Sequence, residues 1–320
     1  MFYFSLKCVT INLGDDIMIL SINNITKSFS EKQVLNGVSF SAQSGKAVGI
    51  LGRNGAGKTT LIRIIMDVFG ADSGEVYLDG KPIRQQNIKI GYLPEERGLY
   101  PKNKIMEQLI YFASLQGIDK KTATNTANSL FKRLQIEEYK NRRLDTLSKG
   151  NQQKVQLIAT LITNPDIVIL DEPFSGLDPV NASMLKDIVK ELISNGKLVL
   201  FSSHQMNYIE EFCNEILILN GGKIVLGGAI KDIKRSYARN IIEIIADNPQ
   251  EIANFLNSST FDFIKRVSVE NDKLIITLKD EQFKDKLMES LSQFGNSIDA
   301  FTVKEPTLNE IFVSYTEGQI

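Results

Sequence analysis

Residues 52–60 have the types and spacing needed to hold a phosphate chain. They read Gly-Arg-Asn-Gly-Ala-Gly-Lys-Thr-Thr and fit the pattern G-x-x-x-x-G-K-[ST], with Gly52, Gly57, Lys58 and Thr59 at its fixed positions. Glycines let backbone N–H groups converge on one concavity, and a helix that starts there adds its own N–H groups and positive dipole end. The pattern predicts that Lys58 reaches the β- and γ-phosphates of a nucleoside triphosphate and that Thr59 places its hydroxyl on Mg²⁺.

The residues on either side of this loop indicate the elements that must hold it. Residues 47–51 form a short apolar run typical of a buried strand, and residues 61–66 continue in a pattern typical of a helix. A strand, a glycine loop and a helix in this order make a phosphate cradle. The alternative, a chance turn, does not predict these flanking elements.

Two adjacent carboxylates end an apolar run at residues 167–172. Such a run fits a central parallel strand buried on both faces, and ligands of open α/β sheets bind at the carboxyl ends of those strands. There Asp171 would lie beside Mg²⁺, and Glu172 would orient and deprotonate an attacking water. The alternative is a strand that ends in two solvated acids, which the phosphate loop makes the weaker interpretation.

The only histidine, His204, follows a second apolar strand at residues 198–201. A lone histidine is more often structural than catalytic, but at the end of such a strand its imidazole would be placed to hydrogen-bond a γ-phosphate. Between the two strands, residues 175–179 form a tight turn that leads into a helix.

Two other segments give weaker signals. Ser148 and Gly150 stand at the polar entry to a helix, where they would present a hydroxyl and a bare N–H to an anion; equally, they suit an ordinary N-cap. Phe29 precedes an expected strand and would stack on a nucleotide base, although taken alone it is an ordinary core or surface phenylalanine.

The composition limits the class of protein. With ~150 residues per domain, a chain of 320 residues predicts two domains. A net charge of −1 gives no global field that would attract nucleic acid or an anionic membrane. The two cysteines offer neither a disulfide framework nor a metal cluster. No apolar run is long enough to span a bilayer and no signal-peptide pattern opens the chain, so a role at a membrane would need a partner.

The pattern of elements divides the chain into three parts. Residues 1–17 do not fit the pattern of the residues after them, and we expect them to be a mis-assigned start, with translation beginning at Met18. Residues 18–227 hold all the chemistry described above. Residues 228–320 alternate as β-α-β-β-α-β with a last helix, which predicts a small α+β accessory domain. Regulation, dimerisation and partner docking all remain open roles for it.

Taken together, the motifs at 52–60, 147–153, 171–172, 175–179 and 204 resemble those of the ATP-binding cassette (ABC) ATPases in order and spacing. The resemblance covers residues 18–227. It implies an α/β P-loop NTPase fold with a mixed central sheet, an antiparallel β subdomain and a helical signature subdomain. It also implies that ATP is bound by Phe29, Gly52, Arg53, Asn54, Gly55, Ala56, Gly57, Lys58, Thr59 and Thr60.

The same resemblance implies roles for the remaining motifs. Glu172 and His204 would be catalytic, as the Walker B glutamate and the switch histidine. Asp178 would belong to the D-loop. The metal site would use Thr59, Glu95 and Asp171, and the signature presented to a second cassette would use Ser148, Gly150 and Asn151.

Two positions depart from the family pattern. The usual Leu-Ser-Gly-Gly-Gln signature reads Leu-Ser-Lys-Gly-Asn at 147–151, so Lys149 adds a charge. Glu95 stands where the family usually has the Q-loop glutamine, and its carboxylate adds negative charge near the triphosphate. These two departures are the only features that suggest a third interpretation, a degenerate subunit that senses nucleotide without hydrolysing it.

The segments 91–100 and 305–312 and the variant signature resemble ATPase subunits of bacterial ABC-2-type exporters, including sodium and drug extrusion systems. The resemblance implies a separate polytopic permease, a homodimer or heterodimer of cassettes, no nucleic acid, and a place on the inner face of the cell membrane. The alternative is a soluble ABC ATPase that works on ribosomes or DNA. The single cassette and the absence of a long coiled-coil insertion argue against it.

Overall fold

The structure, a computed structural model, describes residues 17–96, 98–237, 239–258 and 261–316, and its contacts divide the chain into two units between Leu226 and Gly227. Residues 1–16 lie outside the described residues, so the expected start at Met18 stays a prediction. In the part of the chain that is described, no helix is both long and apolar enough to cross a membrane.

The first unit is built on a six-stranded sheet with the order β10-β9-β3-β8-β7-β6. Its strands are β3 (Ala47–Gly52), β6 (Ile90–Leu93), β7 (Ile167–Asp171), β8 (Leu198–Ser202), β9 (Glu215–Asn220) and β10 (Lys223–Ala229). β3 runs parallel to β8 and β9, and β7 runs parallel to β6 and β8. Every residue of β7 and β8 is buried, as expected for parallel strands covered on both faces.

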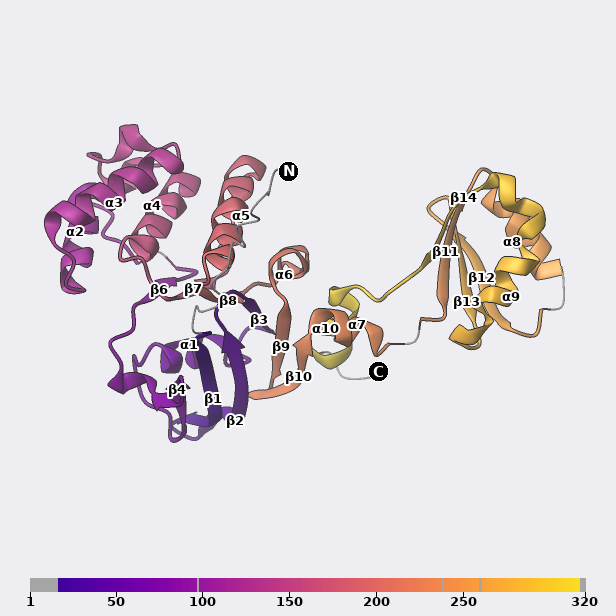
Figure 1. The fold of residues 1–320 in the computed structure, drawn as a ribbon, viewed down its shortest axis with the longest axis horizontal. Helices are drawn as coiled ribbons and strands as arrows, with labels where there is room; N and C mark the ends of the chain where they lie inside the picture. Colours follow the sequence, from indigo (N-terminus) through magenta and orange to yellow (C-terminus); the bar gives the residue numbers. More distant parts are fainter. Residues whose placement is uncertain (1–16, 97, 238, 259–260, 317–320) are drawn as a thin grey trace, which may run out of the picture. The chain divides into compact units, whose positions relative to one another are not determined.

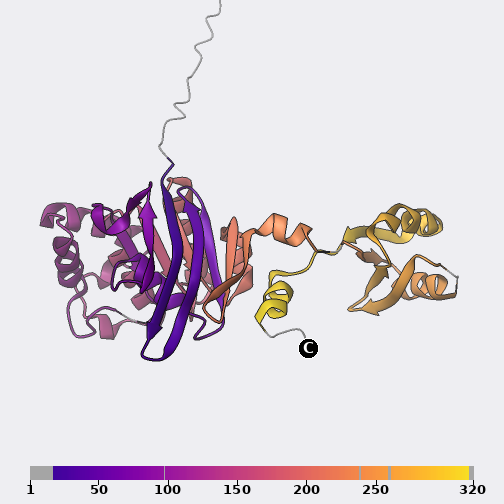
Figure 2. The same ribbon diagram turned by 90° about the horizontal axis from the view of Figure 1, so that it is seen from below.

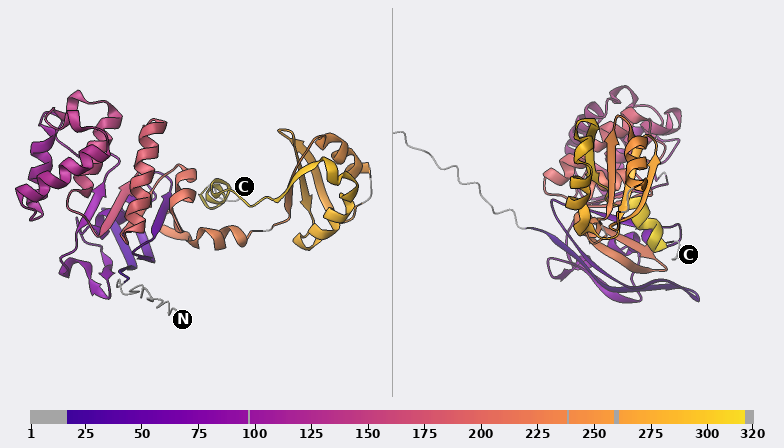
Figure 3. Two further views of the ribbon diagram at one scale, coloured as in Figure 1. Left: turned by 45° about the horizontal axis from the view of Figure 1, so that its top comes forward. Right: turned by 90° about the vertical axis from the view of Figure 1, so that its right-hand side faces the viewer.

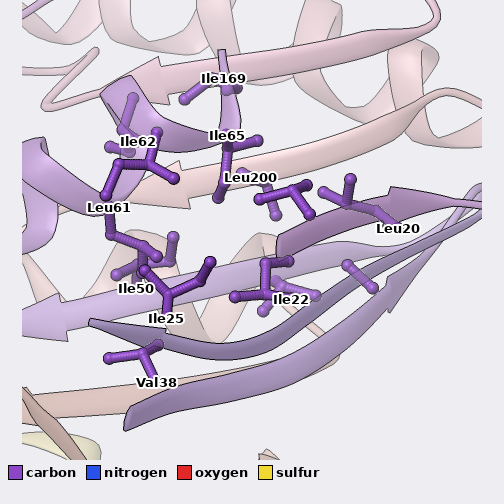
Figure 4. Packing of buried hydrophobic residues seen from close by; sticks show 14 of the residues in the cluster. Leu20, Ile22, Ile25, Val38, Ile50, Leu61, Ile62, Ile65, Ile169 and Leu200 are labelled. Carbon is purple, nitrogen blue, oxygen red and sulfur yellow. The ribbon is translucent and has the colours of Figure 1, made fainter. Parts of the chain in front are cut away.

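A second, antiparallel sheet with the order β2-β1-β4-β5 packs against the first. Its strands are β1 (Ile19–Phe29), β2 (Lys32–Gln43), β4 (Ser73–Leu78) and β5 (Lys81–Pro82), and β1 and β2 are the long indigo strands of Figure 2. Figure 4 shows Ile22, Ile25 and Val38 of this sheet facing Ile50, Ile169 and Leu200 of the central sheet. The resulting core fixes the entry to the phosphate loop.

The helices of the first unit pack on the central sheet or on one another. They are α1 (Lys58–Ile65), α2 (Ile105–Leu115), α3 (Lys120–Arg133), α4 (Lys149–Leu161), α5 (Pro179–Ser194) and α6 (Met206–Phe212), with short 3-10 turns at Ile83–Gln85, Glu137–Tyr139 and Leu144–Thr146. Leu61, Ile62 and Ile65 put α1 into the core between the two sheets (Figure 4). α2, α3 and α4 pack on one another as a helical subdomain (Figure 1).

The helical subdomain is joined to the sheet by a close contact between α4 and β6. A Cβ on Gly91 would lie only 2.5 Å from the carbonyl oxygen of Thr160, so this position admits only glycine without a shift of the helix. The Thr160 hydroxyl also donates to the carbonyl of Tyr92 at 3.1 Å. β6 is thereby anchored to the last turn of α4.

The second unit contains the expected order β-α-β-β-α-β with a last helix, and a short helix that was not expected precedes it. Its elements are α7 (Ile230–Arg235), β11 (Ile241–Ala246), α8 (Pro249–Ser258), β12 (Ile264–Glu270), β13 (Lys273–Leu278), a 3-10 turn (Glu281–Phe283), α9 (Lys284–Ser290), a second 3-10 turn (Ser292–Ser297), β14 (Ile298–Val303) and α10 (Leu308–Thr316). The antiparallel sheet has the order β12-β13-β11-β14. α8 and α9 cover one of its faces (Figures 1 and 3), with Leu256 and Leu287 packed in the same core as Ile244 and Ile276.

The core position of α1 leads to a prediction about stability. Ile65 is fully buried, so Ile65→Ala should lower the free energy of unfolding of the first unit by about 2–5 kcal/mol through lost transfer energy and the remaining cavity. Val68, 63 % exposed, is the control, and Val68→Ala should change it by less than about 0.5 kcal/mol. Urea unfolding followed by circular dichroism measures both. Equal effects of the two substitutions would contradict the packing.

Candidate active site

The phosphate loop connects β3 to α1, as expected, and two of its glycines adopt conformations that other residues rarely take. Gly55 has a φ of 81° and Gly57, which precedes the first turn of α1, has a φ of 106°. A Cβ on Gly57 would lie 2.7 Å from Leu35 Cδ2 and 2.9 Å from the carbonyl oxygen of Val34, both in β2. The loop is therefore pressed against β2 at a point where no side chain fits.

Lys58 opens α1 and folds back over this loop. Its Nζ donates to the carbonyl oxygens of Gly52 at 2.6 Å and Arg53 at 3.4 Å. Thr59 is exposed beside it, and no acidic residue stands in the first turn of the helix. The start of α1 therefore combines a lysine charge, a hydroxyl and the positive end of the helix dipole, the groups that a polyphosphate requires.

The other loop residues that we expected to bind ATP differ in exposure. Arg53, Asn54 and Gly55 are exposed, Ala56 is buried and Thr60 is half-buried. The buried methyl of Ala56 belongs to the core cluster around β3. The buried side chain of Ala56 therefore anchors the exposed backbone of the loop to the core.

Asp171, at the end of β7, is 4 % exposed and lies on the face of the sheet that α1 covers. The register pairs it with Ser202 of β8, and Ile169, which shares its face, packs in the same cluster as α1. One carboxylate oxygen accepts a short hydrogen bond from the Ser202 hydroxyl. The other accepts one from the Tyr92 hydroxyl at 3.3 Å. Two neighbouring strands therefore fix the direction of this carboxylate.

Glu172 is held separately, although it is the next residue. Its backbone has a φ of 49°, a left-handed conformation that is uncommon for a residue other than glycine. Its Oε2 accepts a hydrogen bond from Ser203 Oγ at 3.1 Å and lies 2.9 Å from Nδ1 of His204. Ser203 Oγ in turn accepts from the N–H of Gln205 at 3.0 Å, so its own proton is directed at Glu172.

Sequence reasoning placed Asp171, Glu172 and His204 in one site, and the structure brings these three together. It missed the hydroxyls that hold the carboxylates, which belong to Tyr92, Ser202 and Ser203. The positions of Ser202 and Ser203 in the sequence could have indicated them. Both follow the apolar residues of β8, the parallel neighbour of β7, so they lie beside the last residues of β7. For Tyr92 no comparable signal exists, since its reach to Asp171 depends on the β6–β7 register.

Tyr92 is half-buried beside charged residues. Burial and the charge of Asp171 raise the pKa of Tyr92 to about 12, the charge of Glu95 acts in the same direction, and that of Arg63 opposes it. Glu95 itself is exposed in the segment after β6. The charges of Asp171 and Glu95 thus both act on the Tyr92 hydroxyl.

The signature residues lie at the start of α4. The Ser148 hydroxyl caps this helix by accepting from the N–H of Asn151 at 3.3 Å, so within one chain the ordinary N-cap interpretation is correct. Gly150 adjoins the start of α5, because a Cβ there would lie 2.9 Å from Nδ2 of Asn181. Asn181 donates to Asp178, and backbone N–H groups of α5, that of Asn181 foremost, lower the pKa of Asp178. The signature and the D-loop are thus packed together.

Phe29 is at the turn between β1 and β2, paired with Lys32. Its side chain is 47 % exposed and meets Phe69 edge to face at a centroid distance of 5.7 Å. Lys27 lies 5.5 Å from the centre of the ring. The adjoining part of β2 contacts Gly57, so this partly open aromatic ring belongs to the hairpin that borders the phosphate loop.

Comparison with known proteins adds the family. Residues 35–175 match the model of the ABC transporter family, and residues 228–316 match the C-terminal domain of DrrA1-3-like ATP-binding proteins. An uncharacterized ABC transporter ATP-binding protein of Bacillus subtilis, YhaQ, is 38 % identical over 92 % of this chain and 97 % of that protein. The Nod factor export ATP-binding protein I of Burkholderia lata is 28 % identical over 82 % of this chain and 87 % of that protein.

Solved structures agree with this assignment. The structure of an ATP-binding subunit of an ABC transporter superposes with a TM-score of 0.63 at 27 % identity, over 68 % of this chain and 92 % of that one. The likeness to YhaQ spans nearly the whole of both chains, and the site described above lies in the cassette part. The chain therefore belongs to the ATP-binding proteins of ABC transporters, the ATPases that drive transport.

Proposed function

We propose that this chain binds and hydrolyses Mg-ATP as one half of a cassette dimer and thereby drives a separate polytopic permease that exports its substrate. One observation supports hydrolysis above all others. Glu172 is a buried carboxylate held in one direction by Ser203 and His204, directly after the carboxylate of Asp171. A fixed, hydrogen-bonded carboxylate at the end of a central strand is suited to take the proton of an attacking water.

The two residues beside Glu172 would act in different ways. The imidazole of His204 contacts Glu172 through Nδ1 and has a side chain that is 69 % exposed, so we assign it a second contact to the γ-phosphate. Lys58 and the N–H groups of residues 52–60 would hold the phosphates, and Phe29 would stack on the adenine. In this proposal Phe29 contacts the base of the nucleotide, and Lys58 and His204 contact its phosphates.

The residues present fit Mg²⁺. Thr59, Glu95 and Asp171 supply hard oxygen donors, which Mg²⁺ prefers. Among the described residues, no three His, Cys, Asp or Glu side chains gather into a metal site by themselves. Mg²⁺ is usually held by one or two carboxylates together with substrate phosphates and waters, so this donor set suits an ion that arrives with ATP. When bound, it would neutralise charge on the phosphates.

We assign the signature to a second cassette. The chain has one phosphate loop and one signature, so a site that uses both from different chains requires two cassettes, identical or paired. Ser148, Gly150 and Asn151 would meet the γ-phosphate held by the other chain. Because Gly150 packs on the α5 segment that Asp178 caps, the signature and D-loop would enter the interface as one surface. Lys149 would put a positive charge at the same interface.

Export is supported by the relatives. The name of the Nod factor protein states export, and the DrrA-like C-terminal domain covers the second unit. We therefore place the chain on the inner face of the cell membrane, attached through its permease. Closure of the cassette pair around ATP would move the surfaces that grip this permease, and hydrolysis would reopen the pair.

The assignment of Glu172 predicts a loss of turnover without a loss of binding. Glu172→Gln should lower kcat for ATP by about 10²–10⁴-fold, because the amide cannot accept the proton of water. ATP affinity should stay near that of the parent protein, and Mg-ATP should trap a dimer on size-exclusion chromatography. Glu137→Gln, at an exposed position, is the matched control. Turnover near the parent rate in Glu172→Gln would refute the role of Glu172.

The phosphate loop predicts the opposite pattern for Lys58. Lys58→Ala should raise the Kd for ATP by about 10–100-fold, since a charge-assisted contact to phosphate is lost. Equilibrium binding of a fluorescent ATP analogue measures this change. Lys121→Ala, which removes an exposed lysine from α3, should leave the Kd unchanged. An unaltered Kd in Lys58→Ala would exclude the loop as the phosphate site.

Coupling to a permease is tested by co-expression. The chain should co-purify in detergent with a polytopic membrane protein encoded beside it, and ATP hydrolysis should increase when both are reconstituted in vesicles. An unrelated polytopic protein from the same membrane is the control. If the chain bound both membrane proteins equally and its turnover did not respond to either, the proposed link to transport would be wrong.

A further inference from the structure

Tyr92 contacts Asp171, a residue of the proposed Mg²⁺ site, and the proposed mechanism gives it no role. The register pairs Tyr92 of β6 with Ile169 of β7, and Asp171 lies on the same face of the sheet as Ile169. Side chains of a strand lean along its direction, so the phenol extends toward the end of β7. Its hydroxyl donates to Asp171 Oδ2 at 3.3 Å.

The second oxygen of Asp171 is held from the other side. Ser202 pairs with Asp171 in the register of β7 and β8, and its hydroxyl donates to Oδ1. The carboxylate therefore lies between a tyrosine from one neighbouring strand and a serine from the other. A carboxylate oxygen accepts two hydrogen bonds, so each still has a free direction for a metal or for a metal-bound water.

The position of the Tyr92 ring is itself fixed. The ring is half-buried and packs on the core cluster that includes α1, and the backbone carbonyl accepts a hydrogen bond from Thr160 of α4. A phenol hydroxyl is a neutral donor, whereas a lysine or arginine here would compete with a cation for Asp171.

We propose that Tyr92 is a positioning residue for the metal ion that accompanies ATP, because its hydroxyl, together with that of Ser202, holds Asp171 in the metal-binding orientation before the nucleotide arrives. The inference rests on the proposed role of Asp171 toward Mg²⁺. In this proposal β6, the strand that leads into Glu95, also positions the carboxylate at the end of β7 through the hydrogen bond from Tyr92. Partners of a metal ligand act on metal affinity without touching the metal.

The test separates metal binding from nucleotide binding. Calorimetry measures the Kd of the non-hydrolysable analogue AMP-PNP with excess Mg²⁺ and with EDTA, and the ratio of the two Kd values gives the contribution of the metal. Tyr92→Phe keeps the ring and removes the hydroxyl, so it should reduce this ratio by about tenfold and leave the Kd in EDTA unchanged. An unchanged ratio would overturn the proposal.

Three further variants make the result specific. Tyr77→Phe removes the hydroxyl of a half-buried tyrosine in β4 and should leave the ratio as it is. Ser202→Ala removes the other donor to Asp171 and should reduce the ratio as Tyr92→Phe does. Asp171→Asn removes a proposed ligand itself and should reduce the ratio more than either of these variants. If Asp171→Asn left the ratio unchanged, the proposed metal role of Asp171 would fail; if only Tyr92→Phe had no effect, the positioning role alone would fail.

Discussion

The site depends on keeping two adjacent carboxylates, Asp171 and Glu172, buried beside one another in a region that must also receive a triphosphate. Both are almost inaccessible, and like charges on neighbouring residues repel strongly in a medium of low dielectric constant. Hydrogen-bond partners stabilise both carboxylates. Hydroxyl groups of β6 and β8 donate to Asp171, and Ser203 and His204 contact Glu172. The two carboxylates thus have separate partners, and Glu172 has a left-handed backbone.

This arrangement explains the form of the central sheet. Parallel strands bring their carboxyl ends to one edge, so β6, β7 and β8 deliver Tyr92, Asp171 and Ser202 to one place although they are far apart in the sequence. The apolar residues of β7 and β8 bury both faces of these two strands. The core with α1 fixes the phosphate loop to the same frame.

Much of this was predictable from local patterns. The phosphate loop, the acidic pair and the histidine carry their chemistry in residue type and spacing, and the family assignment that they suggested is confirmed by the comparisons. The fold class is confirmed as well, including the α+β domain after the cassette. The roles of individual residues toward ATP and Mg²⁺ stay predictions, and the structure shows how their side chains are held. Ser148, for example, caps its own helix in the single chain.

The sequence by itself determined which residues are able to bind phosphate, accept a proton or coordinate a cation, since those properties belong to side-chain chemistry and to short motifs. Only the tertiary structure decided which groups support them. Tyr92 and Asp171 meet because two strands pair in one register, Gly150 and Asn181 because two helix starts pack together, and Gly57 and Val34 because one sheet lies on another. Such contacts depend on long-range packing, which no local pattern along the chain records.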